Sequence, residues 1–410
     1  MKQFTDMKKL YTLLSLVLCF SLAHASQNRK VLIIGIDGTR SDALQKANTP
    51  NIDALLPNAL YSYDSWHTAI TWSGPSWASI LTGVYWNKHG VSSNLFLGSK
   101  FAQYPPLPTL AKQIKPNLHC AIVAEWSPLI DNITNASWNS AVKTPDTETW
   151  ITADSAVAQL EKPDIDLLFA YFDQVDVTGH SIGFSPDSAQ YIGAIETVDS
   201  AVGKVLGALY TRPSYAQENW LVLVVTDHGG SSVIHGGNSL VERHIWWIAA
   251  GSVVPHTQIT KADPGTYNCN NNLVFDKLCV NESLMRQSPV HTDVAVTALH
   301  HLLFDTLNPE TKAEWELDGK SWLLPVTAIK ETASITDVSI QPNPSNGMFT
   351  IGNLQLAVEE KLPMEIFSLE GKKVFSEVPQ TAELLVDLHT LKSGVYILKA
   401  GTAVKKIVVE

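Results

Sequence analysis

Cysteine is scarce in this sequence: four occur in 410 residues, and no two of them form a Cys-x-x-Cys pair. A metal site built on closely spaced cysteine thiolates is therefore excluded. Cys120 lies in an apolar, strand-like segment and is expected to be a packed thiol. Cys269 and Cys279 flank an asparagine-rich loop, where export to an oxidising compartment would allow a disulfide.

Positive charge is also in deficit, because 29 lysines and arginines stand against 40 aspartates and glutamates, a formal net charge of -11. Sequence-independent binding to a nucleic-acid polymer needs a basic surface, so that class of function is excluded. An anionic substrate would instead need a local source of positive charge, and bound metal ions are one such source.

No apolar run in the sequence reaches the roughly 20 residues that a membrane-spanning helix needs. Leu10 to Leu22 comes nearest; lysines precede it, and Ala23-His24-Ala25, a small-residue cleavage pattern, follows it. This arrangement predicts a signal peptide over residues 1–25 and no transmembrane segment once that peptide is cleaved.

The sequence does contain a series of continuous apolar, β-branched runs that begins with Val31 to Ile36 and is typical of strands covered on both faces. Similar runs recur at His119–Ala124, Leu167–Phe172, Leu221–Val225 and His244–Ala250. Helical patterns lie between them and are clearest in Ala189–Leu209 and Asp293–Leu303. This alternation predicts an α/β domain whose mostly parallel sheet is sandwiched by helices, with ligands bound beyond the carboxyl ends of the strands.

The stretch from Thr71 to Asn94 has the pattern of a loop that turns into a helix. Pro75 suits the first helical turn, and Gly83 supplies the stop. Ser73 is therefore expected just before a helix N-terminus, where unpaired N–H groups favour an anion. Its hydroxyl is a candidate nucleophile, and the alternative is that Ser73 only caps the helix.

Three of the predicted strands end in aspartate or histidine residues, namely Asp37, Asp176 to His180, and Asp227-His228. A single aspartate at a strand end is often only a turn former, but three such ends weaken that interpretation. Carboxylate oxygen and imidazole nitrogen are the ligands that Zn²⁺ takes where cysteine is absent. Gly179 is expected to let the chain fold back so that Asp176 and His180 point at one ion.

Beyond Lys330 the pattern changes to short alternating strands broken by turns, which predicts a small β-sandwich. The predicted strands include Val338–Ile340, Glu365–Phe367, Leu385–Leu388, Val395–Leu398 and Ile407–Val409. We therefore expect a catalytic domain over residues 26–328, a linker over 329–335 and a separate module over 336–410.

Taken together, these motifs resemble the alkaline phosphatase superfamily, and within it the type I phosphodiesterase/nucleotide pyrophosphatase family. Ile36-Asp37-Gly38-Thr39-Arg40 matches the family's first-strand motif, Ser73 stands at its nucleophile, and Asn94 stands at an asparagine that binds the transferred group. Asp176-x-x-Gly179-His180 and Asp227-His228-Gly229 match the later metal motifs. The likeness covers roughly Lys30 to Pro325, and the motifs occur in the family's order.

This resemblance implies a site with two zinc ions. One ion would be held by Asp176, His180 and His291, and the other by Asp37, Asp227 and His228 with a contact to Ser73. His291 is expected in this role because Pro289 to Asp293 is similar to the segment ahead of the family's last helix. His235 is expected only to line the cleft, and His244 to be a core or edge histidine.

The implied activity is cleavage of phosphodiester or nucleotide pyrophosphate bonds in a small phosphate-ester substrate through a covalent phospho-serine at Ser73. Asn94 and the helix N-terminus would stabilise the non-bridging oxygen. A phosphomonoesterase or sulfatase on the same scaffold and a non-catalytic surface-binding protein are the alternatives. A monoesterase would need an extra cation, for which Arg40, Lys88 and Lys100 are candidates.

Ser73-Gly74-Pro75-Ser76-Trp77 also resembles the sulfatase signature, with one informative departure. Trp77 stands where sulfatases need an arginine for oxidation of the nucleophile to formylglycine. Asp37 is followed by Gly38, where sulfatases have a second aspartate. Both differences favour an unmodified serine.

The C-terminal module resembles the type A sorting domain of the type IX secretion system. The likeness is carried by Asn343 to Gly347, Gly371-Lys372, Ser393 to Leu398 and Lys405 to Val408. It implies a Bacteroidetes-type bacterium, contact with the type IX machinery and export to the cell surface or the medium. The alternative is a carbohydrate- or surface-binding β-sandwich.

Overall fold

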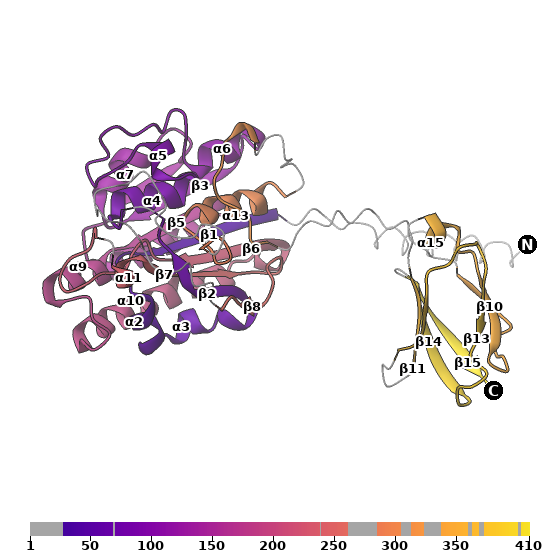
Figure 1. Ribbon diagram of the computed structural model, residues 1–410. Coiled ribbons are helices and arrows are strands. Elements are labelled where there is room, and N and C mark those ends of the chain that lie inside the picture. Colours follow the sequence, from indigo (N-terminus) through magenta and orange to yellow (C-terminus); the bar gives the residue numbers. More distant parts are fainter. Residues whose placement is uncertain are drawn as a thin grey trace, which may run out of the picture. The chain divides into compact units, whose positions relative to one another are not determined.

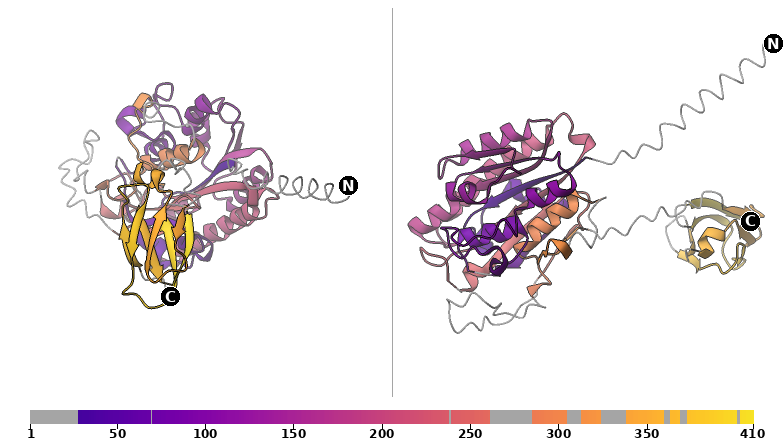
Figure 2. Two further views of the ribbon diagram at one scale, coloured as in Figure 1. Left: turned by 90° about the vertical axis from the view of Figure 1, so that its right-hand side faces the viewer. Right: turned by 90° about the horizontal axis from the view of Figure 1, so that it is seen from above.

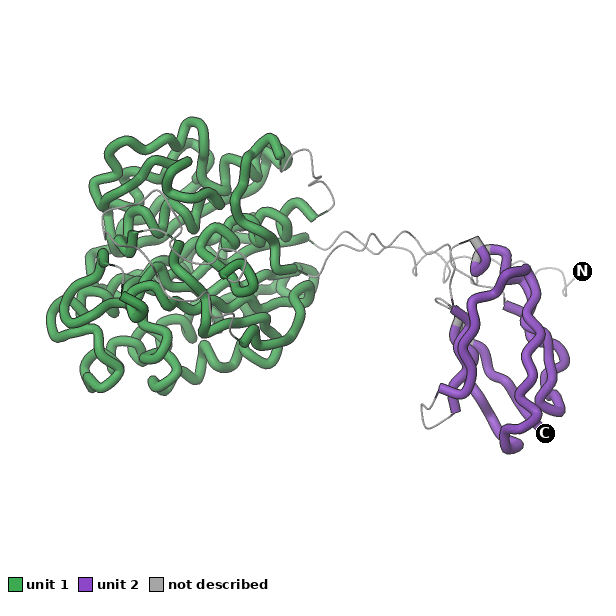
Figure 3. The backbone as a smooth tube through the Cα atoms, viewed as in Figure 1, with its two compact units in different colours: residues 1–324 green, residues 325–410 purple. Residues whose placement is uncertain are grey.

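The chain divides into two compact units, residues 1–324 and residues 325–410, in a computed structural model (Figure 3). The structure describes residues 28–260 except 69 and 238, and then 285–304, 313–323, 338–359, 363–368, 373–400 and 403–410. The expected signal peptide, the expected linker, Cys269 and Cys279 lie outside the described residues.

An eight-stranded sheet forms the centre of the first unit, with strand order β4-β3-β5-β1-β6-β7-β2-β8 (Figure 1). Its strands are β1 (Asn28–Ile36), β2 (Ala59–Trp66), β3 (His119–Ala124), β4 (Ser140–Lys143), β5 (Ile165–Phe172), β6 (Glu218–Val225), β7 (His244–Ala250) and β8 (Thr257–Gln258). Only β7 runs antiparallel to its neighbours among these described strands. The prediction of a mostly parallel sheet is confirmed.

Strand β1 shows why these strands are apolar throughout. Val31 and Ile33 lie in the core on one face of the sheet, while Leu32 and Ile34 lie in the core on the other. Successive side chains of a strand point to opposite faces, so a strand covered on both sides needs an unbroken apolar run. The predicted sandwich of helices around the sheet is therefore confirmed as well.

Helices cover both faces of the sheet (Figures 1 and 2). One face packs against α4 (Ser73–Thr82), α6 (Leu107–Ile114), α7 (Ser127–Ile133) and α13 (Thr292–Leu302). The other packs against α2 (Ser41–Lys46), α3 (Pro50–Asp53), α8 (Thr149–Leu160), α9 (Gln174–Ile182) and α10 (Ala189–Tyr210). Shorter elements are η1 (Leu56–Asn58), α5 (Trp86–His89), η2 (Tyr215–Gln217) and α11 (Leu240–Arg243). None of the described helices has both the length and the apolar character needed to cross a membrane.

The second unit is a small β-sandwich, as predicted. One sheet contains β9 (Ser339–Gln341), β10 (Met348–Gly352) and β13 (Leu384–Asp387). The other contains β11 (Met364–Ser368), β12 (Lys373–Glu377), β14 (Gly394–Ala400) and β15 (Ala403–Val409), and a short helix, α15 (Gln355–Glu359), follows β10. Phe349 of one sheet and Ile366 and Leu398 of the other share a single buried core, so the two sheets pack face to face.

Candidate active site

The candidate site lies where three neighbouring strands of the first unit end. Strands β5, β1 and β6 are adjacent and parallel, so their carboxyl ends meet at one edge of the sheet. Asp37 follows β1, Asp227 follows β6, and Asp173 caps helix α9 directly after β5. The topology thus brings together residues that are far apart in the sequence.

One cluster consists of Asp37, Asp227 and His228, all of which are buried. Nε2 of His228 lies 3.2 Å from Oδ2 of Asp227 and 3.6 Å from Oδ1 of Asp37. The backbone N–H of Gly38 donates to the other oxygen of Asp227 over 3.0 Å, which holds that carboxylate in place. These three side chains match the sequence expectation for one metal site.

A second cluster consists of Asp176, His180 and His235. Nε2 of His180 lies 3.3 Å from Oδ2 of Asp176 and 3.0 Å from Nε2 of His235. Nε2 of His235 lies 3.6 Å from Oδ1 of Asp176. The three pairwise distances are short enough for one cation to contact all three side chains.

Asp176 and His180 come together on a helix, not on the folded-back chain that the sequence suggested. They occupy positions i and i+4 of α9, which share one face. Gly179 has a different use here, because a Cβ at this position would lie 2.4 Å from the ring of Phe184. The glycine lets that ring pack against the helix.

The two clusters adjoin through stacked imidazole rings. The ring centroids of His228 and His235 lie 3.7 Å apart at an interplanar angle of 23°. Asp176, His228 and His235 together also offer ligand atoms within 4.8 Å of one another. The two clusters therefore form one continuous group of candidate ligands.

Backbone carbonyls fix the orientation of all three histidines. Nδ1 of His228 lies 2.8 Å from the carbonyl of Gly229, Nδ1 of His180 lies 2.9 Å from that of Val233, and Nδ1 of His235 lies 2.6 Å from that of Thr71. A carbonyl only accepts, so each Nδ1 carries the hydrogen, and in a neutral ring this leaves Nε2 to present its lone pair to the site. This is the arrangement in which an imidazole binds a metal ion.

His291 does not join these clusters, although the resemblance implied it as a ligand. Its ring packs edge-to-face against His67 with centroids 4.4 Å apart, and it belongs to neither group of candidate ligands among the described residues. The structure brings His235 to Asp176 and His180 in its place. The sequence signal was a histidine next to Gly236, in the same loop as the Asp227-His228 motif.

The carboxylates of the site are arranged for a cation. Asp37 Oδ1, Asp176 Oδ1 and Asp227 Oδ2 are buried and accept no hydrogen bond within the described part of the chain. Burial raises the pKa of Asp37 well above its usual range, and the charge of Asp176 raises it further. Burial likewise raises the pKa of Asp227, followed by the charge of Asp37. Uncompensated buried carboxylates are unfavourable, so this donor set fits bound divalent metal ions.

The surroundings of the three histidines shift their pKa values in different directions. Burial lowers the pKa of His228 to about 3, and burial lowers the pKa of His235 to about 3 as well. Both are therefore neutral at physiological pH, which is the form that binds metal. A hydrogen bond to Asp176 instead raises the pKa of His180 to about 9, because this more exposed ring is paired with a carboxylate.

Ser73 is the first residue of α4, one position further into the helix than the sequence suggested. Trp72 occupies the N-cap position, and no side chain caps the helix there. Oγ of Ser73 lies 3.3 Å from Nε2 of His228, so the hydroxyl faces the buried cluster. The structure thus gives Ser73 a position beside the candidate ligands and no capping role.

Asn94 lies directly against the start of the same helix. Its Oδ1 accepts a hydrogen bond from the backbone N–H of Gly74 over 2.8 Å. A Cβ on Gly74 would lie 2.7 Å from the carbonyl oxygen of Ser93, so only glycine allows this approach. With its oxygen engaged, the amide NH₂ of Asn94 is the end left to donate to a ligand.

Comparison with known proteins gives two family matches. A model of the type I phosphodiesterase / nucleotide pyrophosphatase family matches residues 31–293. A model of a secretion system C-terminal sorting domain matches residues 339–410.

Individual relatives match the first unit. The chain is 26% identical over 247 residues to human ectonucleotide pyrophosphatase/phosphodiesterase family member 7, covering 54% of this chain and 52% of that protein. It is 24% identical over 220 residues to human bis(5'-adenosyl)-triphosphatase ENPP4, covering 49% and 47%. The chain therefore spans about half the length of these curated relatives. The structure of murine ectonucleotide pyrophosphatase/phosphodiesterase 5 shares the fold, with a TM-score of 0.51, 16% identity, and coverage of 67% of this chain and 95% of that chain.

Proposed function

This chain belongs to the type I phosphodiesterase/nucleotide pyrophosphatase family, and we propose that it is a metal-dependent hydrolase that cleaves phosphodiester or nucleotide pyrophosphate bonds through Ser73. One observation carries the proposal. Three buried carboxylate oxygens without hydrogen-bond partners among the described residues, and three imidazoles held by backbone carbonyls at Nδ1, lie beside a serine at a helix N-terminus. A binding protein has no use for this combination.

This chain would hold two zinc ions. One would be bound by Asp37, Asp227 and His228, and the other by Asp176, His180 and His235. When bound, such ions supply positive charge for the attacking and leaving oxygens of an in-line displacement.

Ser73 is the nucleophile of the proposed reaction. Its Oγ loses its proton and attacks phosphorus while the bond between phosphorus and the leaving oxygen breaks, which gives a phospho-serine and a leaving group that departs with a proton on its oxygen. A water molecule then attacks the same phosphorus and releases Ser73. The position of Ser73 in the first turn of α4 restricts its side chain, so the hydroxyl is held in place before the substrate arrives.

Asn94 and the N-terminus of α4 stabilise the charge that develops on the non-bridging oxygen. The amide NH₂ of Asn94 donates a hydrogen bond, and the helix dipole adds a favourable field. The hydrogen bond from the backbone N–H of Gly74 holds Asn94 in the position that this stabilisation requires.

Arginine and lysine side chains that could bind the extra charge of a phosphate monoester are paired with other groups, which favours a diester as the substrate. A phosphate monoester carries one more negative charge, which would need an additional cation. Arg40 donates to Asp42 and to the carbonyl of Phe184, and Lys88 forms an ion pair with Asp318 over 2.7 Å. Two of the three candidate cations are therefore engaged elsewhere.

Export is set by the second unit. The sorting domain directs the chain through the type IX secretion system to the cell surface or the extracellular space. The substrate is accordingly a small phosphate ester met outside the cell.

A substrate panel with and without a chelator tests the proposal. We expect the purified full-length protein to contain zinc and to hydrolyse bis-p-nitrophenyl phosphate faster than p-nitrophenyl phosphate or p-nitrophenyl sulfate, with activity lost to the chelator. Ser73→Ala should lower kcat at least about a thousandfold and keep its zinc. Ser181→Ala, which changes an exposed serine of α9, is the matched control. Wild-type turnover by Ser73→Ala, or full activity without metal, would contradict the proposal.

A further inference from the structure

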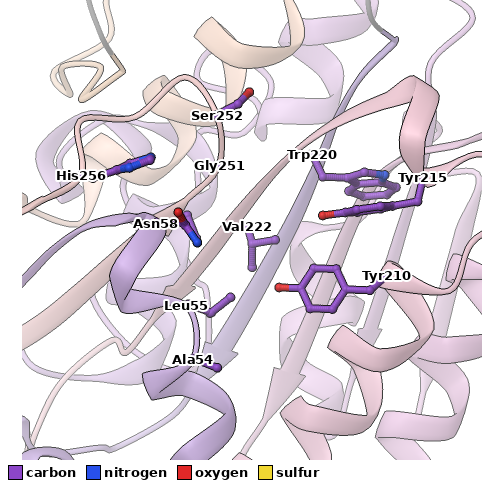
Figure 4. A pocket seen from close by; sticks show the side chains of 11 residues that line it. Ala54, Leu55, Asn58, Tyr210, Tyr215, Trp220, Val222, Gly251, Ser252 and His256 are labelled. Atoms are coloured by element: carbon purple, nitrogen blue, oxygen red, sulfur yellow. The ribbon is translucent and has the colours of Figure 1, made fainter.

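A second pocket of about 470 Å³ lies in the first unit, between the start of β6 and the loop after β7. Figure 4 shows Tyr210, Tyr215 and Trp220 on one side of it, Asn58 and His256 on the other, and Val222 between them. Its volume falls in the range of small-molecule sites, about 300 to 1,000 Å³.

This pocket is separate from the candidate active site. Trp220 lies near the amino end of β6, whereas Asp227 follows the carboxyl end of the same strand. Seven residues separate the two, and a strand rises ~3.3 Å per residue, so the two sites are about 23 Å apart along β6. The pocket therefore needs an explanation of its own.

An aromatic wall with a fixed orientation forms one side. Nε1 of Trp220 donates to Glu218 over 2.7 Å, and the guanidinium of Arg212 lies 5.3 Å from its ring centroid. Tyr210 and Tyr215 pack edge-to-face with centroids 5.5 Å apart. Tyr210 nevertheless remains 47% exposed, so much of its ring is available to a ligand.

The opposite side offers hydrogen-bonding groups. Asn58 and His256 supply an amide and an imidazole, and the hydroxyl of Ser252, which donates to Asn219 over 3.1 Å, can still accept a hydrogen bond. No aspartate, glutamate, lysine or arginine is among the described residues that line the pocket. A charged ligand such as a phosphate would find no opposite charge here, whereas a neutral ligand rich in hydroxyls would find partners.

We propose that this pocket binds a neutral pyranose sugar. A pyranose ring has an apolar C–H face and a rim of hydroxyl groups. The face suits the exposed ring of Tyr210, and the rim suits Asn58, Ser252 and His256. A purely apolar ligand would displace water from the amide of Asn58 and the imidazole of His256 without replacing its hydrogen bonds, which opposes its binding. The proposal does not depend on the activity proposed for Ser73.

Saturation-transfer NMR on the full-length protein tests this proposal, with maltose, lactose and N-acetylglucosamine as probes and adenosine as a planar aromatic comparison. We expect transfer to the ring C–H protons of at least one sugar. Tyr210→Ala should raise its Kd about tenfold or more, because the largest exposed aromatic face is lost. Trp150→Ala is the matched control, since Trp150 is 49% exposed on α8 and does not line the pocket.

A second variant tests whether the polar side of the pocket contributes to sugar binding. Asn58→Leu keeps the approximate size of the side chain and removes its hydrogen bonds, so sugar binding should also weaken. Thermal unfolding of each variant at the wild-type temperature establishes that the fold is retained. Three outcomes overturn the proposal: no transfer to any sugar, unchanged sugar binding by Tyr210→Ala, or transfer to adenosine alone.

Discussion

The indole Nε1 of Trp77 donates a hydrogen bond to Oδ2 of Asp37 over 2.8 Å, in the fully buried interior beneath the candidate site. The hydroxyl of Tyr171 donates to the same oxygen over 2.6 Å. Both bonds go to Oδ2, so Oδ1 is left free to face the site. Gly35 makes room for this indole, because a Cβ there would lie 2.5 Å from its ring.

Replacing Trp77 should therefore weaken metal binding. Trp77→Phe keeps most of the packing and removes one of the two donors that orient Asp37. Loss of such an outer partner typically lowers metal affinity about 10- to 100-fold. Zinc affinity measured by competition with a chelator checks this. Trp322→Phe is the control, because it also removes an indole hydrogen bond to an aspartate, Asp293. Equal zinc affinities for the two variants would contradict the prediction.

The identity of the third histidine ligand can be tested directly. His235→Ala should lower the zinc content from two ions per chain to one, because His235 contacts both Asp176 and His180. His291→Ala should leave the zinc content at two, since the His291 ring packs on His67. Metal analysis of the two purified variants checks this, and the opposite pattern would restore the ligand set that the resemblance implied.

The sequence predicted the elements that depend on local patterns and missed those that depend on contacts between residues far apart in the sequence. The central strands were predictable because burial on both faces demands an unbroken apolar run. Strand β2 was missed, since Tyr61 to Asp64 mixes polar and aromatic residues at an irregular burial pattern. Its place comes from pairing with β7, which no local pattern records.

The candidate site was likewise predictable where it depends on local sequence, and not where it depends on contacts between distant residues. Aspartates at strand ends were predictable because parallel strands deliver their carboxyl ends to one edge. His235 was not, because its position depends on hydrogen bonds from its loop to Thr71, which lies 164 residues away in the sequence. The helical face shared by Asp176 and His180 was also missed, because a glycine within a short segment opposes a helix unless packing requires it.

Asn94 should matter for turnover more than for substrate binding. Asn94→Ala removes the proposed donor to the non-bridging oxygen and the acceptor for Gly74, so kcat should fall about 10²- to 10³-fold. Asn94→Asp keeps the acceptor for Gly74 and should still be inactive, because a carboxylate repels the phosphoryl oxygens. Steady-state kinetics on bis-p-nitrophenyl phosphate checks both variants. Near-normal kcat for Asn94→Asp would show that the residue acts only on the helix.

A buried carboxyl group should make the stability of the first unit depend on pH. Burial, together with the neighbouring Asp173, raises the pKa of Glu125 from 4.5 to about 9. The folded protein then holds a proton that the unfolded chain releases above pH 4.5. The stabilisation is complete below pH 4.5 and is lost as the pH rises towards 9.

Glu125→Gln removes this titration while keeping the side chain's size. The difference in Tm between wild type and variant should therefore shift in favour of the variant as the pH rises from 5 to about 9. Glu161→Gln, at an exposed position after α8, serves as the control and should follow the wild type. A pH-independent difference in Tm would mean that Glu125 does not hold the proton.

The second unit should be separable from catalysis by a single core substitution. Phe349 is 1% exposed and packs with Ile366 and Leu398 in the sandwich core. Phe349→Ala removes a buried ring and costs about 3–5 kcal/mol, which is a large share of the stability of a domain this small. The purified full-length variant should hydrolyse phosphodiesters at the wild-type rate, while its amount in the medium relative to the cell falls. Leu385→Ala, at a side chain 65% exposed on β13, should leave both quantities unchanged. Normal export of Phe349→Ala, despite a melted second unit, would show that sorting does not require the folded sandwich.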